Sequence, residues 1–187
     1  MSERERCQEI REQIRKLCSQ YGDEYWRKLD KESQYPEQFV DELTNAGWLA
    51  ALIPEQYGGS GLTVTEASVI LEEINRSGGN AAACHAQMYI MGALLRHGND
   101  EQKKRYLPSI AAGKLRLQAF GVTEPDAGSD TTHIRTNARR EGDHYIVNGG
   151  KIFTSRVQHS DTVSYTHLRA HETDSYLVCR VLVEKKK

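Results

Sequence analysis

The chain has 187 residues, of which 38% are hydrophobic, and its 25 Lys and Arg residues nearly balance 26 Asp and Glu residues, for a net charge of -1. This length and composition suffice for a globular protein with a sizeable core, in one large or two small domains. The near-zero charge excludes a strongly basic nucleic-acid-binding protein and gives no electrostatic reason to expect an anionic membrane as partner.

Cysteine usage and apolar runs bear on the compartment. Cys7, Cys18, Cys84 and Cys179 have no paired spacing, which indicates buried thiols in a reducing environment. No apolar run approaches the roughly 20 residues of a membrane span, and the start MSERERCQEIREQ has neither a hydrophobic signal core nor an Arg-rich, acid-poor leader. We therefore expect a cytoplasmic protein, or a mitochondrial-matrix protein if the source is eukaryotic.

Helical patterns open the chain. Apolar residues at helical spacing run through 7–21, after a capping box formed by Ser2 and Glu5. A short helix is predicted over 36–47, with a proline in its first turn and a glycine at its end.

Three further helical segments follow a glycine-rich loop, PEQYGGSGLT. Thr63 and Glu66 predict a capped helix that ends near residue 75. The segment 80–97 carries no charge before its last residues, which predicts a helix buried on most of its surface. A polar helix, capped by Asn99 or Asp100, is expected to end near Pro108.

The pattern changes to strands after Gly113. Residues 115–122, 134–140 and 144–152 have strand character, and the sequence EGD between the last two predicts a tight hairpin. Helices followed by strands argue for two domains, not for a parallel βαβ sheet. The predicted fold class is α+β, with an N-terminal all-α helical domain over 1–115 and the start of an antiparallel β domain over 116–161.

The last part of the chain differs in character. Residues 162–187, TVSYTHLRAHETDSYLVCRVLVEKKK, lose the alternation expected of a continuing sheet and end on a lysine run. The segment resembles the tails that arise when a truncated gene fragment is translated into attached adaptor DNA. We interpret it as a non-native tail.

The stretch FGVTEPDAGSD, residues 120–130, has the residue types of a ligand-binding turn. Its glycines allow close backbone approach or positive φ, and its Thr and Ser supply short hydrogen-bonding groups. Together with PEQYGGSG, RHGNDEQKKRYLP and NGGKIFTS, in this order, the stretch resembles the acyl-CoA dehydrogenase family of flavoproteins over residues 30–161.

This resemblance implies a site for FAD. In the family, a helical domain and a central β domain enclose FAD with an acyl-CoA thioester, and a second helical domain follows; the residues here match the first two domains. Thr123 would lie at the polar edge of the flavin ring, and Ser129 near the pyrophosphate or the thioester ligand. The expected FAD contacts are Phe120, Val122, Thr123, Gly128, Ser129, Phe153, Thr154 and Ser155.

Two positions depart from the usual family pattern. Phe153 stands where Trp is commoner, and Ser155 where Thr is usual, and both replacements keep an aromatic ring and a hydroxyl. The resemblance also implies that Met88 and Ser129 contact substrate, although a Met on an apolar helix is more often a core residue. His85 is expected to be a buried, hydrogen-bonded histidine.

Neither a metal site nor a nucleophile is predicted. His167, His171 and Cys179 have no fourth ligand at credible spacing, and no GxSxG elbow is present. In the family the catalytic Glu lies in the second helical domain, so no residue of this chain is assigned as the base, and Glu124 is not promoted to that role.

The implied reaction is the α,β-dehydrogenation of an acyl-CoA thioester to a trans-2-enoyl-CoA, with electrons passed to an electron-transferring flavoprotein by a homotetramer. This chain is then an N-terminal fragment with little or no activity. Two alternatives stay open: a non-catalytic module that binds an acyl-CoA or a partner without flavin, and a related acyl-CoA oxidase or nitroalkane-oxidising flavoenzyme. Acyl-chain length and branching do not follow from the sequence.

Overall fold

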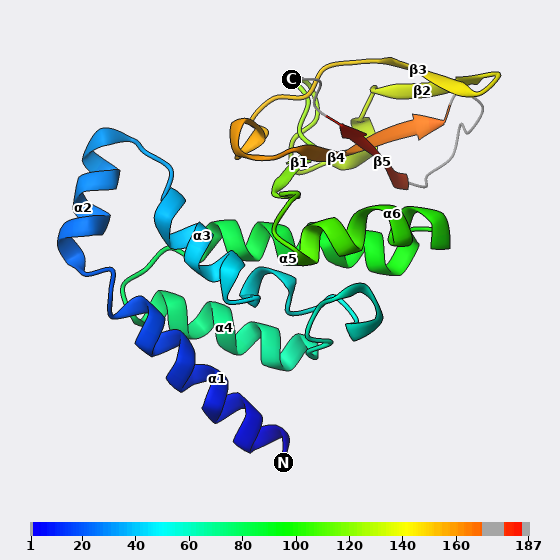
Figure 1. The fold of residues 1–187 in the computed structure, drawn as a ribbon. Helices are drawn as coiled ribbons and strands as arrows, with labels where there is room; N and C mark the ends of the chain where they lie inside the picture. Colours follow the sequence, from blue (N-terminus) through cyan, green and yellow to red (C-terminus); the bar gives the residue numbers. More distant parts are fainter. Residues whose placement is uncertain (1, 170–177, 185–187) are drawn as a thin grey trace.

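A computed structural model of the chain describes residues 2–169 and 178–184, and it divides them into a helical domain and a β domain. Figure 1 shows the helices gathered on one side, with α5 and α6 directly beneath the strands. The six α-helices of the described residues are α1 (Glu3–Cys18), α2 (Asp23–Glu32), α3 (Glu37–Asn45), α4 (Val64–Arg76), α5 (Ala82–His97) and α6 (Asp100–Ala111).

Side-chain caps set the starts of three of these helices. Ser2 and Glu5 form the capping box of α1, and Thr63 and Glu66 form that of α4, as their sequences predict. Asn99 caps α6, where it accepts a hydrogen bond from the backbone N–H of Gln102 at 2.8 Å. Each cap satisfies amide donors that the first helical turn leaves without a partner.

Two helical features differ from the sequence-based expectation. Helix α2 was not predicted, because its aromatic residues are only partly buried and leave no fully buried stripe. Tyr25 and Trp26 pack edge-on against each other, and Trp26 packs edge-on against Phe39 of α3. Helix α6 runs through Pro108 to Ala111 and does not end at the proline, as the cap residue Ala112 donates its N–H to the Pro108 carbonyl.

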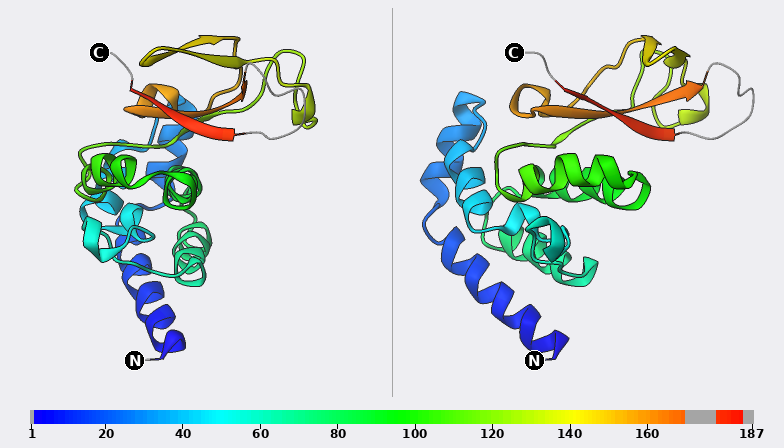
Figure 2. Two further views of the ribbon diagram at one scale, coloured as in Figure 1. Left: turned by 90° about the vertical axis from the view of Figure 1, so that its right-hand side faces the viewer. Right: turned by 45° about the vertical axis from the view of Figure 1, so that its right-hand side comes forward.

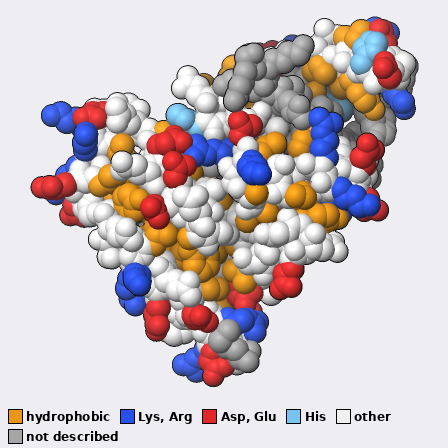
Figure 3. Space-filling view, viewed as in Figure 1, with side chains coloured by type: hydrophobic (Ala, Val, Ile, Leu, Met, Phe, Trp, Pro, Cys, Tyr) orange, Lys and Arg blue, Asp and Glu red, His pale blue; other side chains and the backbone are white. Residues whose placement is uncertain are grey.

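The hydrophobic core of the helical domain has two parts. One joins α1, α3, α4 and the start of α5, and its fully buried side chains include Ile14, Phe39, Leu43 and Ile70. The other joins the end of α5 to α6 and to Leu117, which leads into the sheet. On the face shown in Figure 3, hydrophobic side chains also gather at the surface over α3 and α4.

Helix α1 is fastened to α4 by arginines on buried carboxylates. Arg6 donates to Glu66, and Arg11 and Arg15 donate to Glu73 at 3.4 and 3.0 Å. Glu66 and Glu73 are only 2% and 1% exposed, so each needs such a partner to offset the loss of its hydration. The ion pairs therefore set the angle and register at which α1 lies on α4.

The β domain is a mixed sheet. Its strands are β1 (Ala119–Gly121), β2 (Asn137–Glu141), β3 (His144–Asn148), β4 (Thr162–Arg169) and β5 (Val178–Glu184). The predicted hairpin joins β2 and β3, with Gly142 at φ 63° in its tip. The α+β class is confirmed, but pairing is antiparallel only for β2–β3 and β4–β5; β4 runs parallel to both β1 and β2.

Residues 162–169, which the sequence pattern separates from the sheet, form β4 in the middle of it. The segment lacks alternation because Thr162, Ser164, Tyr165 and Thr166 are all buried, as expected of a strand covered on both faces. The origin of residues 162–187 as a non-native tail stays a prediction. His171 lies outside the described residues, and so does the side chain of Cys179.

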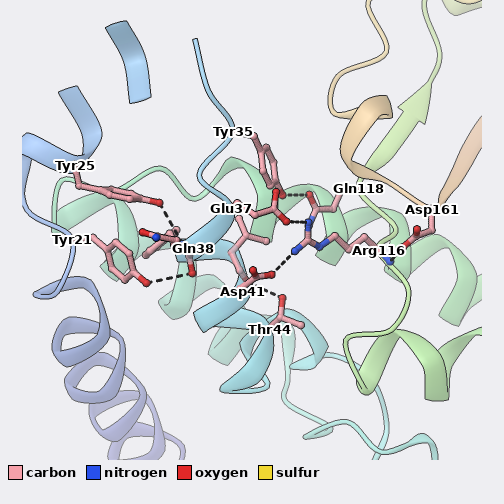
Figure 4. Close-up of polar contacts among 12 residues, drawn as sticks. Tyr21, Tyr25, Tyr35, Glu37, Gln38, Asp41, Thr44, Arg116, Gln118 and Asp161 are labelled. Carbon is pink, nitrogen blue, oxygen red and sulfur yellow. Dashed lines mark hydrogen bonds and ion pairs between the residues drawn. The ribbon is translucent and has the colours of Figure 1, made fainter. Parts of the chain in front are cut away.

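The two domains meet at a polar junction (Figure 4). Arg116 extends its guanidinium to Glu37 and Asp41 of α3, while its backbone N–H donates to the Asp161 carboxylate at 2.8 Å. Tyr35 donates its hydroxyl to Gln118 Oε1 at 2.6 Å, and burial raises the pKa of Tyr35 to about 12. The chain that connects the domains is thus held on both sides.

The cysteines whose side chains the structure describes are free thiols. Cys18 and Cys84 are buried free thiols as predicted, whereas Cys7 is half-buried. Burial raises the pKa of Cys84 to about 12, which keeps its sulfur protonated and unreactive.

Among the described residues, no helix has the length and apolar character that crossing a bilayer requires.

Candidate cofactor site

The stretch 120–130 folds into a closed turn directly after β1. Glu124 and Ala127 exchange two backbone hydrogen bonds, of 2.9 and 3.2 Å, which leaves Pro125 and Asp126 at the tip. Proline fits this position because its ring fixes φ and its missing N–H is not needed there. The residues that follow, Gly128 and Ser129, are exposed.

Glu124 turns its carboxylate inward and is 6% exposed. It accepts hydrogen bonds from the backbone N–H groups of Arg135 and Thr136, at 2.7 and 3.0 Å, and from Lys151 Nζ at 2.7 Å. Burial alone would raise the pKa of this carboxyl, but these donors together outweigh it and lower the pKa to about 2. Glu124 is therefore an ionised structural anchor at neutral pH.

Lys151 joins the turn to the segment that contains Phe153. Its ammonium donates to the Val122 carbonyl at 2.9 Å as well as to Glu124, and its side chain is 12% exposed. The backbone N–H of Ile152 donates to the Thr123 carbonyl at 2.9 Å. Two segments some thirty residues apart thus lie side by side, and they are the two that were predicted to contact FAD.

A glycine lets the second segment approach the sheet. Gly149 has φ 149°, and a side chain built on it would lie 2.3 Å from the hydroxyl of Thr136. No other residue fits there without displacing β2. The close approach to Thr136 therefore explains why the first residue after the Asn of NGGK, Gly149, is a glycine.

The predicted cofactor contacts lie at or near the surface of this pair of segments. Phe120, Val122, Thr123 and Thr154 are half-buried, and Gly128, Ser129, Phe153 and Ser155 are exposed. Phe153 has a left-handed backbone, φ 56°, and leaves 86% of its surface in water. Folding leaves this ring without a cover, and a planar ligand would supply one.

The site has the donors that a flavin nucleotide needs. Thr123, Ser129 and Ser155 carry hydroxyls on short side chains that are half-buried or exposed, and a Cβ at Gly128 would meet nothing within 4 Å, so a ligand has room above the turn. Hydroxyls and backbone N–H groups bind phosphate without requiring a high net charge. The residues present thus fit FAD.

Met88 and His85 lie apart from these segments on α5. Met88 is 4% exposed and belongs to the core of the helical domain. His85 was expected to be buried and is exposed, because it lies on the face of α5 that carries Tyr89. The Tyr89 ring lies between His85 and Phe120, with centroid distances of 5.2 and 5.9 Å. A substrate role for Met88 stays a prediction.

The sequence did not indicate the Glu124–Lys151 pair, because single charged residues in a glycine-rich turn usually face solvent. The available signal was weak: Lys151 follows two glycines, and Glu124 precedes a proline. Only their meeting in space shows the role of the pair.

Two family models match successive parts of the chain. The N-terminal domain of acyl-CoA dehydrogenases matches residues 4–114, and the middle domain of the same enzymes matches residues 119–187.

Among curated proteins, acyl-CoA dehydrogenase FadE12 of Mycobacterium tuberculosis is 35% identical over 162 residues, which cover 86% of this chain and 42% of that protein. The 3-(aryl)acrylate reductase of Clostridium sporogenes is 35% identical over 161 residues, 83% of this chain and 42% of that protein. Among solved structures, an acyl-CoA dehydrogenase from Geobacillus kaustophilus matches with a TM-score of 0.82 and 26% identity, over 99% of this chain and 49% of that one. The chain spans less than half the length of these relatives.

Proposed function

The chain belongs to the acyl-CoA dehydrogenase family, and on that premise we propose that the complete protein holds FAD and converts an acyl-CoA thioester to a trans-2-enoyl-CoA. FAD would accept the hydride from the β-carbon of the acyl chain, and the proton would leave the α-carbon, next to the thioester carbonyl. The chain described here would supply binding, orientation and exclusion of water.

Two groups of residues would hold the cofactor. Thr123, with Phe120 and Val122 beside it, would meet the edge of the ring system, and Ser129 with Gly128 would meet the pyrophosphate or the thioester ligand. Phe153 would cover one face of the ring, and the hydroxyl of Ser155, next to Thr154, would donate to a ring nitrogen.

One observation carries this proposal: the Glu124–Lys151 pair, together with the hydrogen bond from Ile152 N–H to the Thr123 carbonyl, fixes both groups side by side. Two walls that are joined by an ion pair and a backbone hydrogen bond are suited to a rigid, planar ligand, since little order has to be gained on binding.

The proposed reaction also needs a base to take the proton next to the thioester carbonyl. Glu124 is unsuited to it, since its carboxylate is buried and already engaged by Lys151 and two backbone N–H groups. We therefore expect the 187-residue chain alone to show little turnover. In the complete protein, a homotetramer would pass electrons to an electron-transferring flavoprotein.

Flavin binding tests the proposal directly. FAD is titrated into the purified chain while flavin fluorescence is followed, for the wild type, Phe153→Ala and Tyr145→Ala. Tyr145, 55% exposed on β3, serves as a matched exposed aromatic residue outside the site. We expect saturable quenching that Phe153→Ala weakens at least tenfold, roughly the worth of one aromatic stacking contact, and that Tyr145→Ala leaves unchanged. Equal binding by both variants would contradict the assignment.

A further inference from the structure

A cleft of about 410 Å³ opens where the β domain meets the start of α3. One wall is the connection between α2 and α3, with Ser33 and Tyr35, and another is the start of α5, with Asn80. The third wall is the segment from Thr154 to His159, which includes the short turn η4 (Val157–His159). Figures 1 and 2 show this turn, in orange, on the side of the β domain that faces α2 and α3.

Arg156 is the basic residue of this cleft that lacks a counter-charge. Its guanidinium forms no ion pair with any residue in the described ranges, and its Nε is buried without a hydrogen-bond partner. Arg116, at the same junction, has two carboxylates. Among the described residues that line the cleft, none is Asp or Glu. A buried N–H of a charged group that lacks an acceptor is costly, so the fold keeps Arg156 there at a loss of stability.

The other lining groups suit an anion too. Thr154 and Ser33 bring hydroxyls, and Asn80 brings an amide whose oxygen is already used by the backbone N–H of Ala82, at 2.8 Å, so its NH₂ group stays a donor. The start of α5 adds the positive end of a 16-residue helix. His159, stacked on Tyr35 with ring centroids 4.0 Å apart, makes a flat wall.

The backbone around the cleft is strained in a consistent pattern. Three non-glycine residues of the described chain have positive φ: Ser33 at 51°, Phe153 at 56° and Arg156 at 57°. Ser33, which caps the C-terminus of α2, and Arg156 both line the cleft, and Phe153 precedes Thr154, which also lines it. Such residues cost of order 1 kcal/mol each and concentrate at ligand sites. At Arg156 the left-handed conformation begins the turn that directs the next residues along the cleft.

We propose that this cleft binds an oxyanion, a carboxylate or phosphate group carried by a small ligand, with Arg156 as the charged donor and the hydroxyl of Thr154 and the amide of Asn80 beside it. The cleft is larger than one oxyanion, so the rest of the ligand would lie along the Tyr35–His159 wall. The cleft shares Thr154 with the proposed flavin contacts, whereas its charged donor Arg156 and the amide of Asn80 are not among them.

The test uses the 187-residue chain and two probes, inorganic pyrophosphate and glutarate, each at ionic strength matched with sodium chloride. Affinity is measured by calorimetry, and the Arg Nε–H signals are followed by ¹H–¹⁵N NMR. Arg156→Gly removes the cation, and glycine tolerates the left-handed backbone, so this variant keeps the fold. Arg4→Gln, at an exposed position of α1, is the matched loss of one positive charge.

We expect one probe to bind the wild type and Arg4→Gln equally and Arg156→Gly at least tenfold more weakly. The one Nε–H signal that is missing from Arg156→Gly should move on binding. Tighter binding of pyrophosphate would indicate a phosphate ligand, and tighter binding of glutarate a carboxylate ligand. Failure of both probes to bind, or equal binding by Arg156→Gly, would overturn the proposal.

Discussion

Glu124 shows how a carboxylate in a turn proposed to bind a ligand can have a structural task. It lies between Pro125 and the half-buried Thr123, and its partners come from two later parts of the chain: the backbone at 135–136 and Lys151. A buried carboxylate with three donors stays ionised and holds its neighbours in place. Its position in the turn serves to orient the groups that face outward.

Removing this charge should loosen the turn. Glu124→Gln leaves Lys151 buried without a counter-charge, so we expect a loss of about 3 kcal/mol in the free energy of unfolding, measured with urea. Asp126→Asn is the control, since that carboxylate is exposed and pairs only with the exposed Arg135; its loss should stay below about 0.5 kcal/mol. An equal loss of unfolding free energy in both variants would show that the buried Glu124 carboxylate stabilises the fold no more than an exposed one does.

Acid should act on the same residue. The pKa of Glu124 is lowered to about 2 in the folded chain, from the ordinary value of 4.5 that applies to the unfolded chain. Its contribution to stability is thus complete above pH 4.5 and declines as the pH falls toward 2. Thermal unfolding between pH 6 and pH 2 should show a drop in Tm that is smaller in Glu124→Gln. A parallel drop in both proteins would assign acid sensitivity to other carboxylates.

Single residues were the least predictable part of the site. The motifs indicated which segments would carry ligand contacts, and the structure places those segments together. They did not indicate that Phe153 would be exposed with a left-handed backbone, that His85 would face solvent, or that the Nε of Arg156 would be buried without a hydrogen-bond partner. Each of these depends on what packs against the residue from elsewhere in the chain.

At the level of helices, α1 contacts α4 through charged side chains as well as through its apolar face. Glu73 receives two arginines and is 1% exposed, whereas Glu72, its neighbour in sequence, pairs with Arg11 at the surface with 58% of its side chain exposed. The two carboxylates differ mainly in burial. They therefore form a natural comparison on one helix.

Glu73→Gln should release α1. We expect a loss of about 2 kcal/mol, because the arginines lose their charged acceptor in a buried position, and faster hydrogen exchange confined to the amides of α1. Glu72→Gln should cost less than about 1 kcal/mol. If exchange accelerates over the whole helical domain, α1 does not behave as a separately opening element.

Helix starts were predictable because a cap is a local property. Ser2, Thr63 and Asn99 each precede their helix with a partner three residues later, and no distant contact is needed to form the cap. The ends of the strands were not predictable in this way. The segment 115–122 contributes only β1, because the backbone N–H groups of Arg116 and Gln118 donate to the side chains of Asp161 and Ser160 and not to a neighbouring strand. Helix α2 was missed since its packing relies on Phe39 of the next helix.

At the scale of the whole molecule, the order of the predicted elements indicated a helical part followed by a β part, as the structure has them. It could not predict the strand order β1-β4-β2-β3, because parallel pairing of β4 with β1 joins residues more than forty positions apart. The junction that sets the relation between the domains likewise comes from residues distant in sequence.

Arg116 is the residue on which this junction should depend most. Arg116→Ala removes both contacts to α3 but keeps the backbone bond to Asp161. We expect a loss of about 1–2 kcal/mol and faster proteolytic cleavage within residues 113–118, as the connection loosens. Lys114→Ala, an exposed change two residues away, should alter neither. Unchanged cleavage in Arg116→Ala would mean that the apolar contacts of Leu117 suffice.

The Glu124–Lys151 pair has a consequence for how this fold can vary. The β2–β3 hairpin lies in sequence between Thr136 and Gly149. The Glu124–Lys151 pair joins the segment before the hairpin to the segment after it. A change in the length of the hairpin should therefore leave the spacing of the two segments proposed to contact the ligand unchanged. The tip at Gly142 is where insertions should accumulate in evolution and where a reporter could be grafted, with the segments at its base keeping their spacing.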